Sequence, residues 1–283
     1  MKVLAEIQTA RQRVTLAEQD GQVGMLINDS IQFHGGDQGP LHELLVSLPL
    51  CLHRCPRRVL VLGGGIGLAA REALRYPEVE RLVLVEIDPE LVELTRTHPV
   101  MRALHCDAFS DPRVELVIAD AFAWVATCRE RFDLVVNAVD VSFTPQDQEM
   151  TEQTIRHFWT AERELLREAG WLTDYLNDVE IGEYFDGDLG KAVRDFPAAL
   201  GEGMAQALWA VYRGAHAGQH LFAYASHDPD LAQVRRPVPS GCEYLDDQLV
   251  RSFLKRGYLP GQRPLSIKNH VALEATGEQR KHQ

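Results

Sequence analysis

The feature that most constrains the fold is a strand, a glycine-rich turn and a helix in direct succession. Residues 59–62, Val-Leu-Val-Leu, form a continuous apolar run of the kind typical of a strand buried on both faces. The turn Gly-Gly-Gly-Ile-Gly follows at residues 63–67, and residues 68–75 have a helical pattern. Such a turn can pass close to a ligand, because the Cβ of any other residue would obstruct both the backbone conformation and the approach.

The same alternation of strand and helix continues to about residue 180. Further strands are predicted over residues 81–86, 114–119, 132–136 and 171–176, with one helix beginning at Pro89 and another spanning residues 149–168. Two later apolar runs, residues 207–212 and 220–226, indicate an antiparallel pair at one edge of the sheet. The pattern predicts an α/β fold, a Rossmann-like, doubly wound and mostly parallel sheet.

The region before this sheet has a different pattern. Short strands are predicted over residues 14–17, 24–28 and 30–33, followed by a helix over residues 41–50 that stops near Pro49. We therefore expect a small β-strand domain over residues 1–56, a catalytic α/β domain over residues 57–275, and a frayed tail over residues 276–283.

Composition narrows the function classes. The 283 residues include 29 Lys or Arg and 41 Asp or Glu, a formal net charge of −12 that argues against nucleic acid or an anionic membrane as the main partner. The charge permits a cationic substrate, although it is equally explained by solubility. No spacing of the 5 cysteines or the histidines indicates a zinc or other metal site, and we expect reduced thiols in a cytoplasmic protein.

Two acids are placed where a nucleoside would meet them. Glu86 ends the second predicted strand, 23 positions after Gly63, where a carboxylate accepts hydrogen bonds from the hydroxyls of a ribose. Asp120 follows the third strand, where it could accept from an adenine amino group, cap the next helix, or do both. Because the turn lacks the full dinucleotide pattern, this set favours an S-adenosyl ligand over a nicotinamide one.

With these residues in view, the chain resembles the spermidine synthase family of polyamine aminopropyltransferases. The stretches that carry the resemblance are VLVLGGGIGLAAREALRYPEVERLVLVEIDPELVEL, DPRVELVIADAFAWV and FDLVVNAVD, preceded by an Ile-Gln strand end and a His-Glu pair that opens a helix. The resemblance covers about residues 22–180. It implies a methyltransferase-like fold with an N-terminal β-domain, an aminopropyl donor (decarboxylated S-adenosylmethionine), an amine acceptor and a homodimer, with no permanently bound cofactor.

The resemblance also implies a role for each site residue. The residues expected to hold the nucleoside or to pass beneath its thioether end are Gln32, His42, Gly63, Gly64, Gly65, Glu86, Ile87, Asp120 and Ala121. Asp140 is expected to orient or deprotonate the amine, with Asn137 as a hydrogen-bond partner.

The chain departs from the family pattern where the amine would be handled. The family typically has an acid at the position of Ile66, an acid at the position of Asn137, a tyrosine at Leu41 and a proline at Val141. Two alternatives follow: a methyl- or aminocarboxypropyltransferase that uses S-adenosylmethionine itself, and an inactive nucleoside-binding homologue.

A cluster of acids after the fifth strand offers substitutes for the missing ones. It comprises Asp174, Asp178, Glu180, Glu183, Asp186 and Asp188. We expect this segment to lie over the carboxyl ends of the strands, where it could attract a polycation, although a solvated acidic loop is the simpler interpretation. Tyr175 and Tyr184 could line an acceptor pocket, with core or lid packing the simpler reading.

Overall fold

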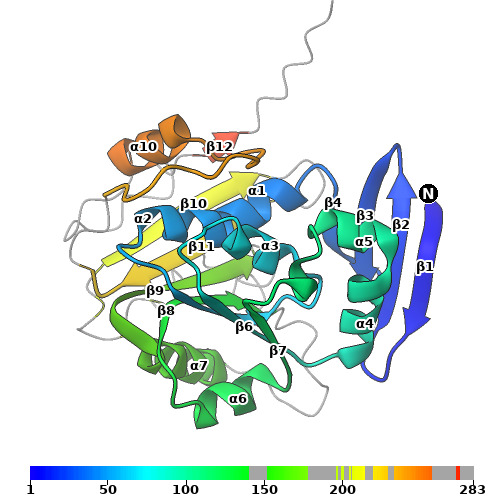
Figure 1. The fold of residues 1–283 in the computed structure, drawn as a ribbon, viewed down its shortest axis with the longest axis horizontal. Helices are drawn as coiled ribbons and strands as arrows, with labels where there is room; N and C mark the ends of the chain where they lie inside the picture. Colours follow the sequence, from blue (N-terminus) through cyan, green and yellow to red (C-terminus); the bar gives the residue numbers. More distant parts are fainter. Residues whose placement is uncertain are drawn as a thin grey trace, which may run out of the picture.

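The computed structural model describes residues 1–139, 152–177, 196, 199–200, 204, 206–213, 219–228, 233–256 and 272–274. A large sheet of eight strands has the order β12-β10-β11-β9-β8-β5-β6-β7 (Figure 1). Its strands are β5 (Arg58–Gly63), β6 (Arg81–Glu86), β7 (Val114–Ile118), β8 (Phe132–Ala138), β9 (Leu166–Asn177), β10 (Gln206–Arg213), β11 (Gln219–Ser226) and β12 (Ala272–Glu274). The five strands from β5 to β9 are mutually parallel, as predicted.

Strand order places the ligand crevice. The first strand of the parallel set, β5, lies between β6 and β8. The chain adds β6 and β7 on one side of β5, and then adds β8 and β9 on the other side. In open α/β sheets this switch point leaves a crevice at the carboxyl ends of the strands. β10 and β11 form the predicted antiparallel pair, in which Gln206 lies opposite Ser226 and Arg213 lies opposite Gln219. β11 also pairs antiparallel with β9.

Helices cover both faces of this sheet (Figure 1). One face packs against α1 (Gln38–His42), α2 (Leu48–Leu52), α3 (Leu68–Leu74) and α10 (Asp247–Arg256). The other face packs against α6 (Ala121–Thr127) and α7 (Glu152–Glu164). The alternation along β5 explains both cores, because Val59 and Val61 face the first set of helices whereas Leu60 and Leu62 face the second.

A separate antiparallel sheet precedes the large one. It contains β1 (Lys2–Gln8), β2 (Arg13–Gln19), β3 (Gln22–Ile27) and β4 (Ser30–His34), and it packs at one end of the molecule beside α4 (Pro89–Thr97) and α5 (Pro99–Leu104) (Figure 1). The three predicted N-terminal strands are confirmed as β2, β3 and β4. β1 was not predicted, since its side chains are mostly exposed or half-buried and give no clear alternation.

Two helix boundaries differ from the prediction. The chain remains helical through Pro49 to Leu52, because a π-helical turn over Glu43–Ser47 shifts the register and places Pro49 in the first turn of α2, where no backbone N–H is needed. The long helix α7 ends at Glu164 rather than near Gly170. Leu166 pairs with Phe132 of β8, and a bulge follows that contains Ala169 at a φ of 61°.

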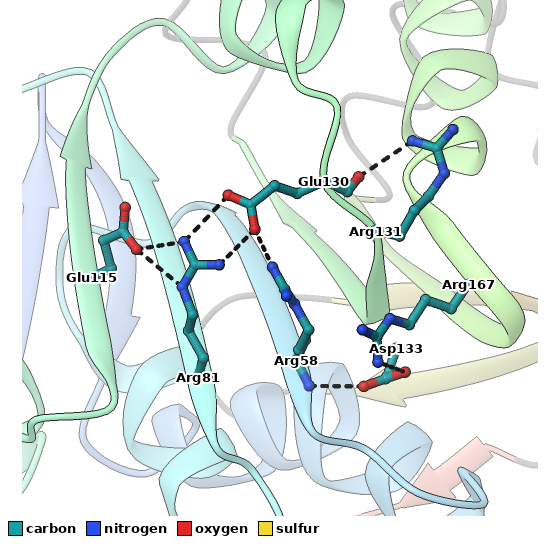
Figure 2. A network of polar contacts seen from close by, with 7 residues as sticks. All are labelled: Arg58, Arg81, Glu115, Glu130, Arg131, Asp133 and Arg167. Atoms are coloured by element: carbon teal, nitrogen blue, oxygen red, sulfur yellow. Dashed lines mark hydrogen bonds and ion pairs between the residues drawn. The ribbon is translucent and has the colours of Figure 1, made fainter.

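Charged side chains join the strands at the edge opposite the crevice (Figure 2). Arg81 donates to Glu115 at 3.0 and 2.6 Å and to Glu130 at 2.5 Å, and Arg58 also contacts Glu130. Hydrogen bonds from Arg81 and the charge of Arg58 lower the pKa of the Glu130 carboxyl. The buried Asp133 accepts the backbone amide of Arg58 at 2.8 Å. This network links side chains at the starts of β5, β6 and β7, away from the crevice.

Candidate functional site

A cavity of about 200 Å³ lies at the carboxyl ends of the parallel strands. Its wall combines the glycine turn after β5, the ends of β6 and β8, the start of α6, the helical run after β4, and residues of the N-terminal sheet. All nine residues predicted to hold a nucleoside line it: Gln32, His42, Gly63, Gly64, Gly65, Glu86, Ile87, Asp120 and Ala121. The structure therefore brings together residues that are up to about ninety positions apart in the chain.

The glycine turn needs its glycines for two physical reasons. Gly63, Gly64 and Gly67 have φ values of 75°, 79° and 81°, in the left-handed region that side chains with a Cβ rarely adopt. In addition, a Cβ on Gly63 would lie 2.8 Å from the carbonyl oxygen of Ala138 at the end of β8. The turn can therefore run against the neighbouring strand while its backbone forms the floor of the cavity.

The Glu86 carboxylate lies against this turn. Its Oε2 accepts the amide of Gly65 at 2.9 Å, and its Oε1 accepts the amides of Ile87 at 2.8 Å and Asp88 at 3.0 Å. Burial raises the pKa of Glu86, and the three amide donors partly oppose this shift. A buried carboxylate that is held by backbone donors and opens on a cavity can exchange those donors for the hydroxyls of a ligand.

His42 offers a neutral ring to the cavity. Its Nδ1 lies 2.7 Å from the carbonyl oxygen of Gln38, and because a carbonyl only accepts, this nitrogen carries the proton. Burial lowers the pKa of His42 to about 4, so the ring is uncharged at neutral pH and Nε2 is an acceptor. The ring can therefore accept a hydrogen bond from a ligand without adding positive charge.

Asp120 caps helix α6, one of the roles left open by the sequence. Its Oδ1 accepts the amide of Ala123 at 3.1 Å, and the residue also lines the cavity. The two roles proposed from the sequence are therefore compatible in space. The cap fixes the carboxylate at the point where the chain turns from β7 into α6.

The spermine/spermidine synthase domain matches residues 39–197, more than half of the chain. The chain belongs to this family. It is 40% identical over 135 residues to polyamine aminopropyltransferase 2 of Ralstonia nicotianae, a match of 48% of this chain and 26% of that protein. It is 36% identical over 172 residues to the polyamine aminopropyltransferase of Saccharolobus solfataricus, a match of 60% of this chain and 56% of the relative. These matches thus cover between about a quarter and just over half of the curated relatives' length.

Solved structures confirm the fold. Spermidine synthase from Thermotoga maritima superimposes with a TM-score of 0.74 at 24% identity, covering 92% of this chain and 85% of that chain. A spermidine synthase in complex with the transition state analogue AdoDATO gives a TM-score of 0.73 at 23% identity, with the same coverage. The expected α/β architecture with a small N-terminal sheet is therefore confirmed.

Of the two residues predicted to contact the amine, the structure describes Asn137 but not Asp140. Asp140 lies outside the described residues. Asn137 is 4% exposed, accepts the amide of Val139 at 3.0 Å, and is not part of the cavity wall, which Ala138 and Val139 form instead. The structure thus places Asn137 behind the wall, on the face of β8 that packs against α7, because side chains alternate along a strand.

Among the acids predicted to lie over the crevice, Asp174 does not. It belongs to β9, is 5% exposed, and accepts a hydrogen bond from Trp159 of α7 beneath the sheet. The other acids of that segment, and Tyr184, lie outside the described residues. Tyr175, the next residue along β9, faces the opposite way: it lines the cavity and packs against Phe222, with ring centroids 5.4 Å apart.

Sequence reasoning missed several parts of the wall. Gln12 enters from the turn between β1 and β2, and Leu45 and Phe222 add apolar surface to the wall. Leu45 and Phe222 look like ordinary core residues in the sequence, and Gln12 lies in a turn with no motif of its own. The described part of the wall therefore combines two carboxylates, Glu86 and Asp120, with a largely apolar remainder.

Proposed function

We propose that this protein transfers an aminopropyl group from decarboxylated S-adenosylmethionine to an amine such as a polyamine. The observation that carries the proposal is the cavity in which the glycine turn, Glu86 and Asp120 meet at the switch point of a spermidine synthase-type sheet. The names of the aminopropyltransferase relatives and the AdoDATO complex of a structural neighbour support the same donor.

The nucleoside half of the donor fits the described groups. Glu86 would accept the two ribose hydroxyls in place of, or beside, its backbone donors. Asp120 would accept the adenine amino group while it continues to cap α6. Gln32 and His42 would complete the polar contacts, and the backbone of Gly63, Gly64 and Gly65 would lie beneath the thioether end, with Ile87 and Ala121 against the nucleoside.

The transfer is a displacement at carbon. The lone pair of a neutral amine nitrogen attacks the aminopropyl carbon bound to the sulfonium, a new C–N bond forms, and the C–S bond breaks. The bonding pair stays on sulfur, which leaves as the neutral thioether of methylthioadenosine. The attacking amine must shed one proton, and by family resemblance Asp140 is the group that orients the amine and accepts it.

One observation favours a second function. Ile66 lines the cavity at the position where the family has an acid that would attract the donor's amino group. An apolar side chain there would not repel the carboxylate of S-adenosylmethionine, so methyl or aminocarboxypropyl transfer from that donor is the alternative. In this second function the same residues would hold the nucleoside, and only the group attached to the sulfonium would differ.

A product assay separates these functions. Purified protein is incubated with either donor and a panel of diamines and polyamines, and the products are identified by mass spectrometry. We expect an aminopropylated amine and methylthioadenosine in equal amounts from the decarboxylated donor. Methylated or aminocarboxypropylated product would instead support the alternative. Nucleoside binding without turnover of any amine would indicate an inactive homologue and overturn the proposal.

Assembly and location are part of the proposal. We propose a homodimer in the cytoplasm, supported by the half-exposed apolar residues Val3 and Ile31 of the N-terminal sheet and by five cysteines that form no disulfide. Within the described part of the chain, no helix combines the length and apolar character needed to span a membrane. Sedimentation velocity tests the dimer; a monomer at micromolar concentration would contradict it.

A further inference from the structure

The turn between β1 and β2 is tied to the rim of the cavity by one buried carboxylate. The Thr9 hydroxyl donates to Oδ2 of Asp88 at 2.7 Å, and Nε2 of Gln12 donates to the same oxygen at 2.9 Å. Asp88 is 1% exposed and lies two residues after Glu86. Because Gln12 is part of the cavity wall, the tie joins the N-terminal sheet to the ligand site.

The two oxygens of Asp88 have separate partners. Oδ1 caps α4 by accepting the amides of Glu90 at 3.0 Å and Leu91 at 3.2 Å, whereas Oδ2 serves only the turn among the described residues. The Asp88 backbone amide meanwhile donates to Oε1 of Glu86 at 3.0 Å. One residue thus contacts the helix, the turn and the carboxylate that faces the cavity.

The β1–β2 turn is organised around the Thr9 hydroxyl, which is hydrogen-bonded to Asp88. The Thr9 oxygen accepts the amides of Arg11 at 3.0 Å and Gln12 at 2.9 Å, and its hydroxyl lies closer to Oδ2 of Asp88, at 2.7 Å, than to the carbonyl oxygen of Gln12, at 3.1 Å. Loss of the Asp88 acceptor would therefore release the Gln12 side chain and leave the Thr9 hydroxyl with the Gln12 carbonyl as its acceptor, so that the turn would no longer be bonded to Asp88. A buried hydrogen bond to a carboxylate is among the stronger ones in proteins.

We propose that Asp88 is a positioning residue that sets Gln12 in the wall of the nucleoside cavity and couples docking of the N-terminal sheet to nucleoside binding. The ligand class rests on the proposed function, whereas the tie itself does not. Since coupling between two sites is reciprocal, a nucleoside that contacts Gln12 also holds the β1–β2 turn against α4.

Asp88→Asn separates the two jobs of this residue. Asparagine remains a good N-cap through Oδ1, but its amide nitrogen would present a donor to the two donors of Thr9 and Gln12. Glu90→Gln is the matched control, because Glu90 accepts the Ala10 amide of the same turn at 2.8 Å on the exposed side. The far-ultraviolet circular dichroism of both variants should match that of the wild type.

Hydrogen exchange of the ligand-free protein tests the tie without any ligand. We expect the amides of residues 9–13 to exchange about 10-fold faster in Asp88→Asn and within about 2-fold of the wild type in Glu90→Gln. Unchanged exchange of this turn in Asp88→Asn would overturn the proposal. This result holds whether or not the protein proves to be an aminopropyltransferase.

A double-mutant cycle tests whether Asp88 acts through Gln12. In calorimetric titrations with methylthioadenosine, Asp88→Asn and Gln12→Ala should each weaken binding about 10-fold, and the double variant should be no weaker than Gln12→Ala alone. If the affinity loss of the double variant equalled the product of the two single losses, the two residues would act independently and the positioning role would be contradicted. Absence of nucleoside binding by the wild type would instead overturn the proposed function. The hydrogen-exchange experiment would still test whether Asp88 holds the β1–β2 turn.

Discussion

Two of the places where this molecule buries an acid, the cavity and the α7 face of the sheet, differ in what surrounds the carboxyl group. Glu86, at the carboxyl end of β6, accepts three backbone amides and opens on the cavity. On the α7 face of the sheet, Glu162 is fully buried with no hydrogen-bond partner for either oxygen among the described residues. Its neighbour Asp174 accepts from Trp159.

The contrast separates a binding group from a core group. Burial raises the pKa of Glu86, but its amide donors favour the charged form and leave a carboxylate ready for ligand hydroxyls. Burial raises the pKa of Asp174 to about 7, and burial together with the nearby Asp174 charge raises that of Glu162. Glu162 and Asp174 therefore both hold a proton more readily than a free carboxyl does, because ionisation inside the core costs stability.

Removing the charge of the binding acid should have the largest effect. Glu86→Gln keeps the shape of the side chain but replaces one acceptor with a donor, so we expect affinity for methylthioadenosine to fall about 100-fold. Calorimetric titration measures this loss. Glu115→Gln, at an exposed acid on the neighbouring strand β7, is the control and should bind normally. Equal affinity of Glu86→Gln and wild type would remove Glu86 from the site.

Removing a charge from the core pair should change stability rather than binding. Folding raises the pKa of Asp174, so the folded state is penalised when this carboxyl is ionised. The protein keeps its full stability below about pH 4 and loses part of it as the pH rises to about 7. Asp174→Asn, which can still accept from Trp159, is free of this penalty, so its advantage over the wild type in unfolding free energy should grow by roughly 2 kcal/mol as the pH rises from 5 to 8.

Urea unfolding across this pH range measures the gain. Glu162→Gln should behave in the same direction, whereas Glu164→Gln, on an exposed position of the same helix, should follow the wild-type profile. Parallel profiles for wild type and Asp174→Asn would show that the pair carries no extra proton in the folded state.

A smaller effect is expected at the second acid of the cavity. Asp120→Asn preserves the α6 cap but weakens acceptance of the adenine amino group, and we expect about 10-fold lower affinity for methylthioadenosine. The purine riboside analogue, which has hydrogen in place of the amino group, should bind wild type and variant equally well. An equal loss for both nucleosides would indicate a general distortion of the site and not an adenine contact.

The smallest predicted effect concerns donor choice. Ile66→Asp introduces a carboxylate at the cavity wall, which would attract the ammonium of decarboxylated S-adenosylmethionine and repel the carboxylate of S-adenosylmethionine. We expect the ratio of the two affinities to shift by about 5-fold toward the decarboxylated donor, with Ile66→Asn as the uncharged control. A shift of equal size in both variants would assign the effect to polarity instead of charge.

Local pattern explains which parts could be predicted. Glu86 and Asp120 follow apolar strands directly, and parallel strands bring their carboxyl ends to one edge, so the nucleoside half of the cavity is readable from the sequence. The sequence does not determine which face of the sheet Asp174 occupies, because a shift of one residue in register moves a side chain to the opposite face. Gln12 and Asp88 meet 76 positions apart through a turn that carries no motif, and contacts of that kind depend on how the two sheets pack.

The central claim is that the cavity holds a nucleoside by its ribose through Glu86. The most direct test is calorimetric titration of the wild-type protein with methylthioadenosine and with its 2′,3′-dideoxy analogue. We predict binding of one methylthioadenosine per chain and affinity about 100-fold lower for the analogue, which lacks both hydroxyls. Equal affinity for the two compounds, or no binding of either, would contradict the account.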